Sequence, residues 1–233
     1  MGVMREIKAI GFDLDGTVLD TRVDYDRLND ADREVLDRHG IPFDDVFGPD
    51  PPVRRRRAPI RDWLDSVGRG DEFPGIDGEI DDLCTFYETQ FIDSAREFPG
   101  TAECIDSLRS MGYRTGLLTR GSREYADRVL PRFGLHDRMD AIVGRDYTWF
   151  DDAKPSPMAM IHFAGELGVE PDEILYVGDS ITDYLPCRDV GAVFVGVLTG
   201  SMDRAGWESA GVVHIIDRVG DLADAIPGIL DSL

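Results

Sequence analysis

The chain has 233 residues and a formal net charge of -21, with 25 basic residues against 46 acidic ones. That length suits one large domain, or a domain with an insertion, and is enough to bury a substantial hydrophobic core. So acidic a chain lacks the basic surface that nucleic-acid binding requires, and no segment approaches the roughly 18 consecutive apolar residues of a transmembrane helix, so neither nucleic acid nor membrane is an expected partner.

The charged residues are unevenly chosen: lysine occurs only as Lys8 and Lys154, and most of the acidic residues are aspartates. An acidic surface repels itself at low ionic strength, and dissolved salt screens that repulsion. We therefore expect a stability that rises with salt and a salt-adapted organism as the source. Residues 1–10 lack the long apolar stretch of a secretory signal peptide, which favours a cytoplasmic protein.

The three cysteines, Cys84, Cys104 and Cys187, are odd in number and far apart, and the chain has no CxxC pair. This spacing suggests neither a disulfide framework nor a zinc site. We expect all three to be small, buried hydrophobic side chains.

The first predicted element is a short buried strand over residues 7–12, which leads directly into Asp13-Leu14-Asp15-Gly16-Thr17. Residues two apart on an extended chain project to the same side, so Asp13 and Asp15 can both reach one site beyond the end of the strand. Two neighbouring carboxylates without a partner repel each other and raise each other's pKa. The pair therefore indicates either a divalent cation or a division of roles between nucleophile and acid.

The next region, residues 21–98, is strongly charged and shows helix-like spacing of apolar residues in three segments. The segments are marked by Leu28, Val35 and Leu36, then by Ile60, Trp63, Leu64 and Val67, and then by Ile80, Leu83, Phe86, Tyr87 and Phe91. Predicted loops separate them at Gly40-Ile41-Pro42, at residues 48–52 and at Phe73-Pro74-Gly75. We predict a small helical cap domain over residues 21–96, inserted into a core formed by residues 1–20 and 97–233.

Four consecutive arginines, Arg54 to Arg57, form the one charge run of the chain. On a helix, four consecutive side chains point all round the axis, so they cannot all face one cleft. The preferred interpretation is a solvated or acid-paired role, with one or two of the guanidiniums left to steer anions.

From residue 99 onward, predicted helices and strands alternate. Strands are expected at residues 115–118, 141–143, 174–177, 192–197 and 212–216. Helices are expected at residues 101–111, 123–133, 155–167, 184–190 and 203–210, with a last one from Asp221. This alternation predicts an α/β fold with a Rossmann-like parallel-sheet core and helices on both faces. Ligands of such sheets bind beyond the carboxyl ends of the strands, where Asp13, Thr119 and Asp179 all fall.

Four motifs lie at or between these strand ends. They are Asp13-Leu14-Asp15-Gly16-Thr17, Thr119 after Leu117-Leu118, Lys154-Pro155, and Gly178-Asp179-Ser180-Ile181-Thr182-Asp183, supported by Phe98-Pro99-Gly100 and Val197-Leu198-Thr199-Gly200. With the motifs in this order, the chain resembles the haloacid dehalogenase-like superfamily, in particular its phosphoglycolate phosphatase-like members with a helical cap inserted after the first strand. The resemblance covers residues 5–20 and 97–216. The cap matches only in its position in the chain and in its helix-like spacing of apolar residues.

The resemblance implies a phosphatase that acts on a small phosphorylated metabolite with Mg2+ as cofactor. Asp13 would be the nucleophile that forms an aspartyl-phosphate. Mg2+ would be held by the Asp13 side chain, the Asp15 main-chain oxygen and Asp179, because hard cations prefer oxygen ligands. Asp15 would protonate the leaving oxygen and then accept a proton from the attacking water.

Other motif residues would bind the phosphate or support the metal. By the same resemblance, Thr119 would donate its hydroxyl to the phosphoryl group, and Lys154 would place a positive charge beside the nucleophile and the phosphate. Lysine at position 154 is informative in a chain that otherwise uses arginine, since a compact ammonium and a planar guanidinium are not interchangeable. Asp183 would support the metal site from behind its ligands, with Ser180 nearby.

Several charged residues allow two interpretations. Many relatives have asparagine after the motif threonine, whereas this chain has Arg120. Arg120 can serve either as a cation for the phosphate or a substrate carboxylate, or as an outward ion-pair partner. Asp151 and Asp152 are interpreted as loop charge rather than as metal ligands, and Lys8 as a solvated side chain.

The alternatives to a phosphatase fit less well. A dehalogenase of this superfamily lacks the second acid of the first motif, so Asp15 disfavours that activity, and a phosphonate-cleaving relative needs a cap lysine that residues 21–98 lack. A phosphomutase keeps all four motifs and is the main competitor among enzymes, while the intact motifs disfavour a catalytically silent regulatory module. The resemblance favours phosphoglycolate as the substrate, while sugar phosphates and nucleoside monophosphates remain open. A monomer and a homodimer fit the sequence equally.

Overall fold

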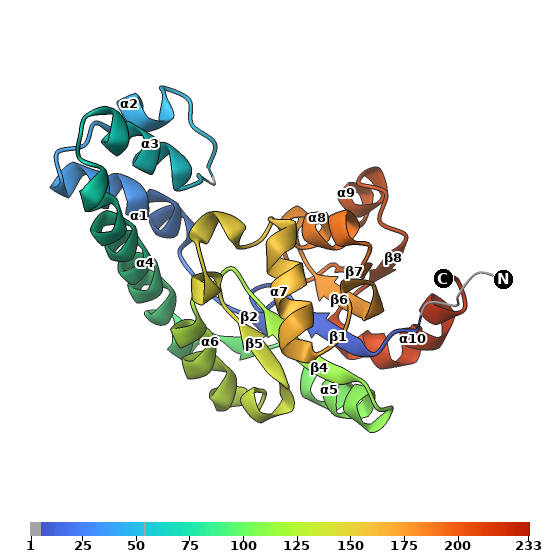
Figure 1. The fold of residues 1–233 in the computed structure, drawn as a ribbon. Helices are drawn as coiled ribbons and strands as arrows, with labels where there is room; N and C mark the ends of the chain where they lie inside the picture. Colours follow the sequence, from blue (N-terminus) through green and yellow to red (C-terminus); the bar gives the residue numbers. More distant parts are fainter. Residues whose placement is uncertain (1–5, 54) are drawn as a thin grey trace.

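The computed structural model of the chain describes residues 6–53 and 55–233. Within them, a parallel sheet with the strand order β5-β4-β1-β6-β7-β8 lies at the centre (Figure 1). Its strands are β1 (Ala9–Phe12), β4 (Arg114–Leu118), β5 (Ala141–Val143), β6 (Ile174–Gly178), β7 (Val193–Val197) and β8 (His214–Ile216). Most of these strands are buried along their whole length, as parallel strands between two helical layers should be. The predicted α/β fold is thus confirmed.

Helices cover both faces of this sheet. One face carries α5 (Thr101–Ser110), α6 (Arg123–Val129) and α10 (Leu222–Leu230), and the other carries α7 (Pro157–Leu167), α8 (Ile181–Val190) and α9 (Arg204–Ser209). The strand β1 alternates between the two layers, because Ile10 and Phe12 join the first hydrophobic cluster and Ala9 joins the second. Between them, a Cβ at Gly11 would lie 2.6 Å from the rings of Phe163 and Tyr176, so only glycine fits there.

The register of the sheet brings the motifs to one edge. Phe12 pairs with Leu117 of β4 and with Val177 of β6, in parallel on both sides. The residues that follow these strands therefore leave the sheet together, which places Asp13 between the ends of β4 and β6. The predicted meeting of the strand ends follows directly from this pairing.

Four helices form a separate group with a hydrophobic cluster of its own. They are α1 (Tyr25–Arg38), α2 (Phe43–Phe47), α3 (Ala58–Ser66) and α4 (Phe73–Thr89). Figure 1 shows this cap to one side of the sheet, with α4 running from it towards α6 of the core. The antiparallel pair of β2 (Leu19–Asp20) and β3 (Arg96–Glu97) lies where the chain enters and leaves the cap. The domain boundaries themselves stay a prediction.

Several bounds of the predicted elements shifted, since α7 begins at Pro157, α8 at Ile181 and β8 at His214, and the following predictions were wrong. Phe73-Pro74-Gly75 is the first turn of α4 rather than a loop, because a proline in the first turn loses no helical hydrogen bond. The short helix α2 was not predicted. The helix predicted over residues 123–133 changes at Leu130 into a 3-10 turn that contains Pro131, which cannot donate an α-helical hydrogen bond.

Short 3-10 helices connect many of the longer elements. They are η1 (Gly70–Glu72), η2 (Ile92–Ser94), η3 (Leu130–Phe133), η4 (His136–Arg138), η5 (Arg145–Tyr147), η6 (Phe150–Asp152), η7 (Pro171–Glu173) and η8 (Val219–Asp221). Two of them, η5 and η6, lie in the segment between β5 and α7 that leads to Lys154.

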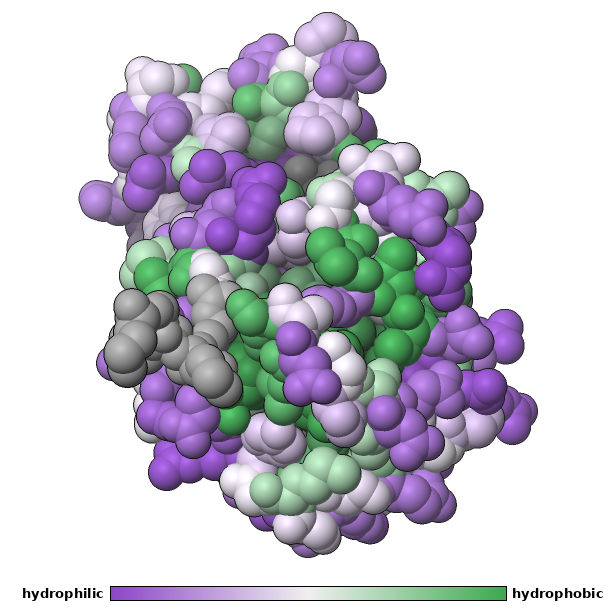
Figure 2. Space-filling view, turned by 90° about the vertical axis from the view of Figure 1, so that its right-hand side faces the viewer, coloured by the Kyte–Doolittle hydropathy of each residue, from purple (hydrophilic) through white to green (hydrophobic). Residues whose placement is uncertain are grey.

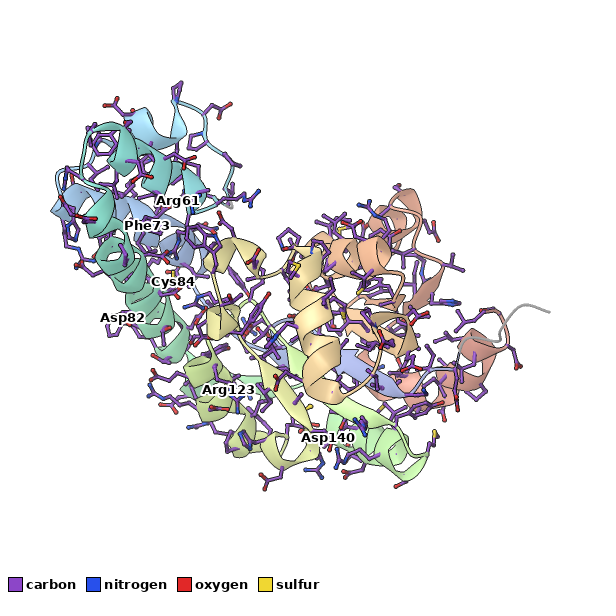
Figure 3. All side chains as sticks on the ribbon, in the orientation of Figure 1. Arg61, Phe73, Asp82, Cys84, Arg123 and Asp140 are labelled. Carbon is purple, nitrogen blue, oxygen red and sulfur yellow. The ribbon has the colours of Figure 1, made fainter. Side chains whose placement is uncertain are left out.

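Hydrophobic side chains make up most of the buried residues, whereas most charged side chains lie at the surface. Figure 2 shows a face on which hydrophilic residues predominate around a smaller hydrophobic area. Along α4, Cys84 is buried while Asp82 is exposed on the outer side of the helix (Figure 3). All three cysteines are buried and free, as predicted. Of the helices in the described part of the chain, none has the length and apolar character needed to cross a membrane.

Candidate active site

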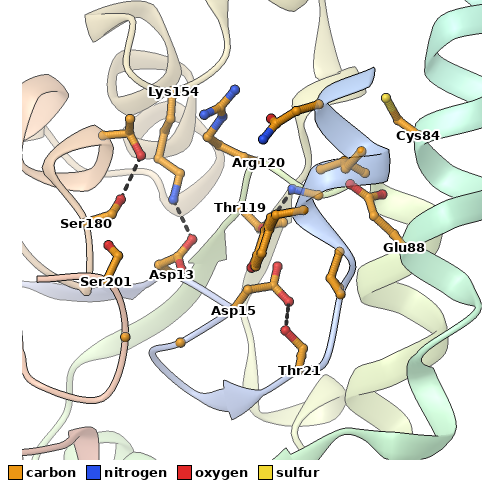
Figure 4. Close-up of a pocket in the computed structure, with 18 of the residues that line it drawn as sticks. Asp13, Asp15, Thr21, Cys84, Glu88, Thr119, Arg120, Lys154, Ser180 and Ser201 are labelled. Carbon is orange, nitrogen blue, oxygen red and sulfur yellow. Dashed lines mark hydrogen bonds and ion pairs between the residues drawn. The ribbon is translucent and has the colours of Figure 1, made fainter. Parts of the chain in front are cut away.

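Asp13 and Lys154 form the centre of a buried ion-pair network at the carboxyl end of the sheet. The backbone N–H of Asp13 donates to the Val177 carbonyl of β6 at 2.9 Å, so the sheet sets the position of Asp13. The Lys154 Nζ atom lies 2.6 Å from Asp13 Oδ1 and 2.6 Å from Asp183 Oδ1 (Figure 4 draws the first pair). Lys154 also donates to Tyr176 Oη at 2.9 Å. One ammonium thereby bridges the first and the fourth motif.

The charges of this network depend on one another because they are buried. Lys154 is only 3% exposed. Burial alone favours its neutral form, but the carboxylates of Asp13 and Asp183 outweigh burial and raise the pKa of Lys154. Burial also raises the pKa of Asp13 well above its ordinary value, while the positive charge of Lys154 acts in the opposite direction. Lys154 is therefore cationic, and a further cation at this site would favour the charged forms of the surrounding carboxylates.

Three buried carboxylates lie close enough to share a metal ion. Asp13, Asp179 and Asp183 each offer one oxygen, and these atoms all lie within 4.8 Å of one another. Oxygen donors at this spacing fit a hard divalent cation such as Mg2+. Burial, followed by the charge of Asp183, raises the pKa of Asp179, and a bound cation would oppose both effects.

Asp183 is already engaged through both of its carboxylate oxygens. Its Oδ1 accepts from Lys154, and its Oδ2 accepts from the backbone N–H and the hydroxyl of Ser180 at 3.0 and 2.8 Å. The bond from the Ser180 N–H is one half of a capping box at the start of α8; in the other half, the Ser180 side chain accepts from the backbone N–H of Asp183. Asp13 and Asp179 are therefore the better placed ligands, and Asp183 orients Lys154 behind them.

Two glycines make room for the carboxylate of Asp179. A Cβ at Gly200 would lie 2.0 Å from Asp179 Oδ2, and a Cβ at Gly16 would lie 3.0 Å from the same oxygen. Gly16 also has a φ of 84°, in the region that favours glycine. The Ser201 N–H donates to Asp179 Oδ2 at 2.7 Å. The first motif and the segment after β7 thus meet at Asp179.

The Asp15 side chain has partners of a different kind. Its Oδ1 accepts hydrogen bonds from Thr21 Oγ1 at 2.5 Å and from Tyr125 Oη at 2.8 Å. Burial raises the pKa of Asp15 to about 6, although both hydrogen bonds oppose that shift. The two aspartates of the first motif therefore lie in different environments, one against Lys154 and one against hydroxyl groups. A carboxyl with a pKa near neutrality suits an acid that gives and regains a proton.

Thr119 directly follows β4, lines the pocket and is 1% exposed. Its backbone N–H donates to the Val143 carbonyl at 2.9 Å, and its Oγ1 accepts from the Gly121 N–H at 2.9 Å. Because the hydroxyl accepts from the backbone, its own hydrogen can be donated to a ligand. Arg120 follows in the same loop and lines the same pocket (Figure 4).

A pocket of about 450 Å³ lies between the core and the cap. This volume is within the range of roughly 300–1,000 Å³ that small-molecule sites occupy. The core contributes the predicted site residues Asp13, Asp15, Thr119, Arg120, Lys154, Asp179, Ser180 and Asp183. The cap contributes residues that include Tyr25, Leu28, Asn29, Ile80, Cys84 and Glu88. The structure therefore brings all the predicted site residues to one pocket, with the cap forming its other wall.

The arginine run contributes to the pocket, but with guanidiniums that are already paired. Arg55 contacts Asp32 at 2.7 Å and Arg57 contacts Asp77 at 2.5 Å, and both arginine side chains are buried. Arg56 is exposed and lies 3.5 Å from Asp151. Arg54 lies outside the described residues. The acid-paired interpretation therefore fits Arg55 and Arg57.

The interpretation of Asp151 as solvated loop charge was wrong. Its side chain is 3% exposed and accepts from the backbone N–H groups of Arg57 and Ala58 at 2.8 and 3.0 Å. The N–H groups at the start of a helix have no partner within that helix. Asp151, which lies in a loop of the core, therefore serves as the N-terminal cap of α3 in the cap domain. Asp151 and Asp152 both lie outside the carboxylate cluster. Lys8 is half-exposed and pairs with Glu173 at 2.5 Å.

Sequence reasoning missed several residues that hold the site together. Thr21 and Tyr125 bind Asp15, Tyr176 binds Lys154, and Ser201 binds Asp179. Tyr176 lies in a strand, where the sequence pattern predicts only a buried core residue. Its hydroxyl nevertheless binds Lys154 and also donates to the Leu118 carbonyl at 2.6 Å. Only the position of Ser201, next to the motif that ends at Gly200, offered a signal in the sequence.

Comparisons with known proteins agree over both core and cap. A family model described as haloacid dehalogenase-like hydrolase matches residues 7–191. In an alignment 233 positions long, the N-acetylmuramic acid 6-phosphate phosphatase of Pseudomonas aeruginosa is 25% identical, with 94% of this chain and 95% of that protein covered. In an alignment 230 positions long, the phosphoglycolate phosphatase of Chromobacterium violaceum is 27% identical, with 95% of this chain and 97% of that protein covered.

A solved structure shares the fold. It is described as a predicted phosphoglycolate phosphatase from Haemophilus somnus 129pt, and it aligns with a TM-score of 0.64 and 22% identity over 96% of this chain and 100% of that one. The shared architecture includes the cap as well as the sheet, since nearly the whole of both chains is covered.

Proposed function

The chain belongs to the haloacid dehalogenase-like hydrolases, and from that premise we propose that it is a Mg2+-dependent phosphatase of small phosphomonoesters that works through an aspartyl-phosphate intermediate. The observation that carries this proposal is the separation of the two motif aspartates. Asp13 lies against Lys154 among the carboxylates, while Asp15 lies against Thr21 and Tyr125 with a pKa of about 6. A nucleophile and a separate proton donor are what phosphate-ester hydrolysis requires.

In the first step, a carboxylate oxygen of Asp13 attacks phosphorus and the bond between phosphorus and the leaving oxygen breaks. Asp15 gives its proton to that oxygen, so the alcohol leaves neutral. Lys154 and the Thr119 hydroxyl bind the phosphoryl oxygens on which charge accumulates. Thr21 and Tyr125 hold the Asp15 carboxyl in place for the transfer.

In the second step, water attacks the phosphorus of the aspartyl-phosphate. Asp15, now ionised, takes the proton of that water, and the bond between phosphorus and the Asp13 oxygen breaks to release inorganic phosphate. Asp13 and Asp179, with the main-chain oxygen of Asp15, would hold Mg2+. Bound there, the cation would neutralise the carboxylates and polarise the phosphoryl group.

Phosphoglycolate is the first substrate to test, because several relatives are named for it, including the Chromobacterium violaceum protein. A sugar phosphate belongs in the same panel, because the Pseudomonas aeruginosa relative is named for N-acetylmuramic acid 6-phosphate. The pocket of about 450 Å³ has apolar cap residues such as Leu28 and Ile80 in its wall. Both a short and a larger leaving group are therefore compatible with its size.

The deciding experiment measures hydrolysis of p-nitrophenyl phosphate with Mg2+ at high salt, for the wild type and for Asp13→Asn. We expect release of inorganic phosphate by the wild type and loss of activity in the variant. Activity that survives the substitution would exclude Asp13 as nucleophile. A panel of phosphomonoesters then ranks the substrates by kcat/KM. Return of labelled phosphate to a sugar instead of to water would favour a phosphomutase.

A further inference from the structure

Arg145 and Glu88 form a buried ion pair between the core and the cap. Arg145 lies just after β5 in the core, and Glu88 lies near the end of α4 in the cap. The Arg145 Nη1 atom is 2.6 Å from Glu88 Oε1, and both residues are 3% exposed. Replacing such a pair by apolar residues is often neutral or stabilising, so stability alone is a weak reason for it.

The guanidinium of Arg145 runs along one face of α4. Its Nε donates to Asp81 Oδ1 at 3.0 Å, and its Nη2 donates to the Asp81 carbonyl at 3.1 Å and to Thr85 Oγ1 at 3.0 Å. Asp81, Thr85 and Glu88 are spaced as neighbours along one side of a helix. A side chain of the core is therefore held by three successive turns of a cap helix.

The same pair also binds the loop that carries Thr119. Arg145 Nη1 donates to the Arg120 carbonyl at 3.3 Å, and the Arg145 backbone N–H donates to the Gly121 carbonyl at 2.9 Å. On the other side of the loop, Glu88 Oε2 accepts from the Ser122 N–H at 3.1 Å. The Gly121 N–H also donates to Thr119 Oγ1, and the Thr119 N–H donates to the Val143 carbonyl. Each residue from Thr119 to Ser122 therefore has at least one backbone group in a hydrogen bond.

The hydrogen bonds of the pair are complete. All five N–H donors of the Arg145 guanidinium have an acceptor, namely Glu88 Oε1, the Arg120 carbonyl, Asp81 Oδ1, the Asp81 carbonyl and Thr85 Oγ1. Each oxygen of Glu88 serves a different partner, one the guanidinium and one the loop. Figure 4 shows Glu88 projecting from α4 on the side of the pocket opposite Lys154.

We propose that Glu88 and Arg145 are positioning residues, which hold the 119–122 loop in the conformation that binds phosphate and make that conformation depend on the placement of α4. The inference rests on the proposed phosphatase function, since it assigns the Thr119 loop to the phosphate. Neither residue acts on the reacting atoms. A shift of α4 away from the core would break the bond to Ser122 and loosen the loop that presents the Thr119 hydroxyl.

The test compares Glu88→Gln with Asp81→Asn. Both substitutions remove one carboxylate from Arg145. Glu88 also binds the loop through Ser122, whereas the Asp81 side chain lies against the guanidiniums of Arg145 and Arg57. Arg145 and Ser122 bind different oxygens of Glu88, and glutamine replaces one of these oxygens with an NH2 group, so one of the two donors would face another donor. Misplacement of a phosphate-binding group by about 1 Å can cost on the order of 100-fold in rate.

We expect Glu88→Gln to lower kcat for p-nitrophenyl phosphate by roughly 10- to 100-fold, with a smaller change in KM. Inhibition by inorganic phosphate should weaken in the same variant, and the amide hydrogens of residues 120–122 should exchange faster. Asp81→Asn should change kcat by less than about threefold and leave that exchange as in the wild type. Melting temperatures of both variants report any general loss of stability.

Equal losses of kcat in the two variants, in proportion to their melting temperatures, would overturn the inference and leave a purely structural ion pair. Unchanged amide exchange at Ser122 in Glu88→Gln would overturn it as well. An inactive wild type would instead refute the phosphatase proposal. In that case the exchange measurement still decides whether Glu88 holds the loop, so the two failures can be told apart.

Discussion

Lys154→Met removes the buried ammonium of the candidate active site while keeping much of the length of the side chain. In the wild type this ammonium lies 2.6 Å from Asp13 and 2.6 Å from Asp183. The variant leaves two buried carboxylates without the charge that both contact, next to the carboxylate of Asp179. The expected result is a loss of both stability and activity.

The magnitude follows from the burial of the pair. Removing one partner of a buried ion pair costs about 3–5 kcal/mol, because the other charge is left unpaired in a medium that solvates it poorly. That is a large part of the roughly 5–15 kcal/mol by which a domain is stable. Lost stabilisation of the phosphoryl group should lower kcat by at least about 100-fold.

The chain offers a matched control, because its other lysine is half-exposed. Lys8 makes an ion pair with Glu173 at 2.5 Å, and Lys8→Met should leave both kcat and the free energy of unfolding nearly unchanged. The assay is urea unfolding without Mg2+ and at constant high salt, together with p-nitrophenyl phosphate hydrolysis. A loss of less than about 1 kcal/mol in Lys154→Met, as for a surface pair, would refute the buried network as described.

Three further predictions concern the metal, the cap and the surface. Mg2+ at 100 times its Kd should raise the free energy of unfolding by about 2.7 kcal/mol. In a thermal-shift titration with Mg2+, Asp179→Asn should remove most of that gain, whereas Asp189→Asn, at an exposed position, should keep it. Asp151→Ala should lower the free energy of unfolding by about 0.5–2 kcal/mol through loss of the α3 cap; if Asp152→Ala costs as much in the same urea experiment, the capping argument fails. The melting temperature should rise from dilute buffer to molar KCl, because salt screens the net charge of -21; an unchanged value would contradict a repulsive acidic surface.

Local patterns were enough to predict the sheet and the residues at its edge. Apolar runs alternate with helical spacing along the core, and a parallel sheet must bring the carboxyl ends of its strands together. Asp13, Thr119 and Asp179 could therefore be assigned to one site from their positions after β1, β4 and β6. Element bounds were predicted wrongly where one residue type is typical of two local structures. Pro74 is an example, because proline occurs in the first turn of a helix as well as in loops.

The sequence by itself determined which core residues meet at the pocket, because most motif residues take their place from the strand that each one follows. Only the tertiary structure decided how those residues are held. The bonds from Tyr125 to Asp15, from Glu88 to Ser122 and from Asp151 to α3 join segments far apart in the chain. In a chain with 46 acidic residues, no local pattern separates a carboxylate in water from one that must find a partner when the cap packs on the core. Burial makes that distinction, since an unpaired charge costs little on the surface and several kcal/mol inside.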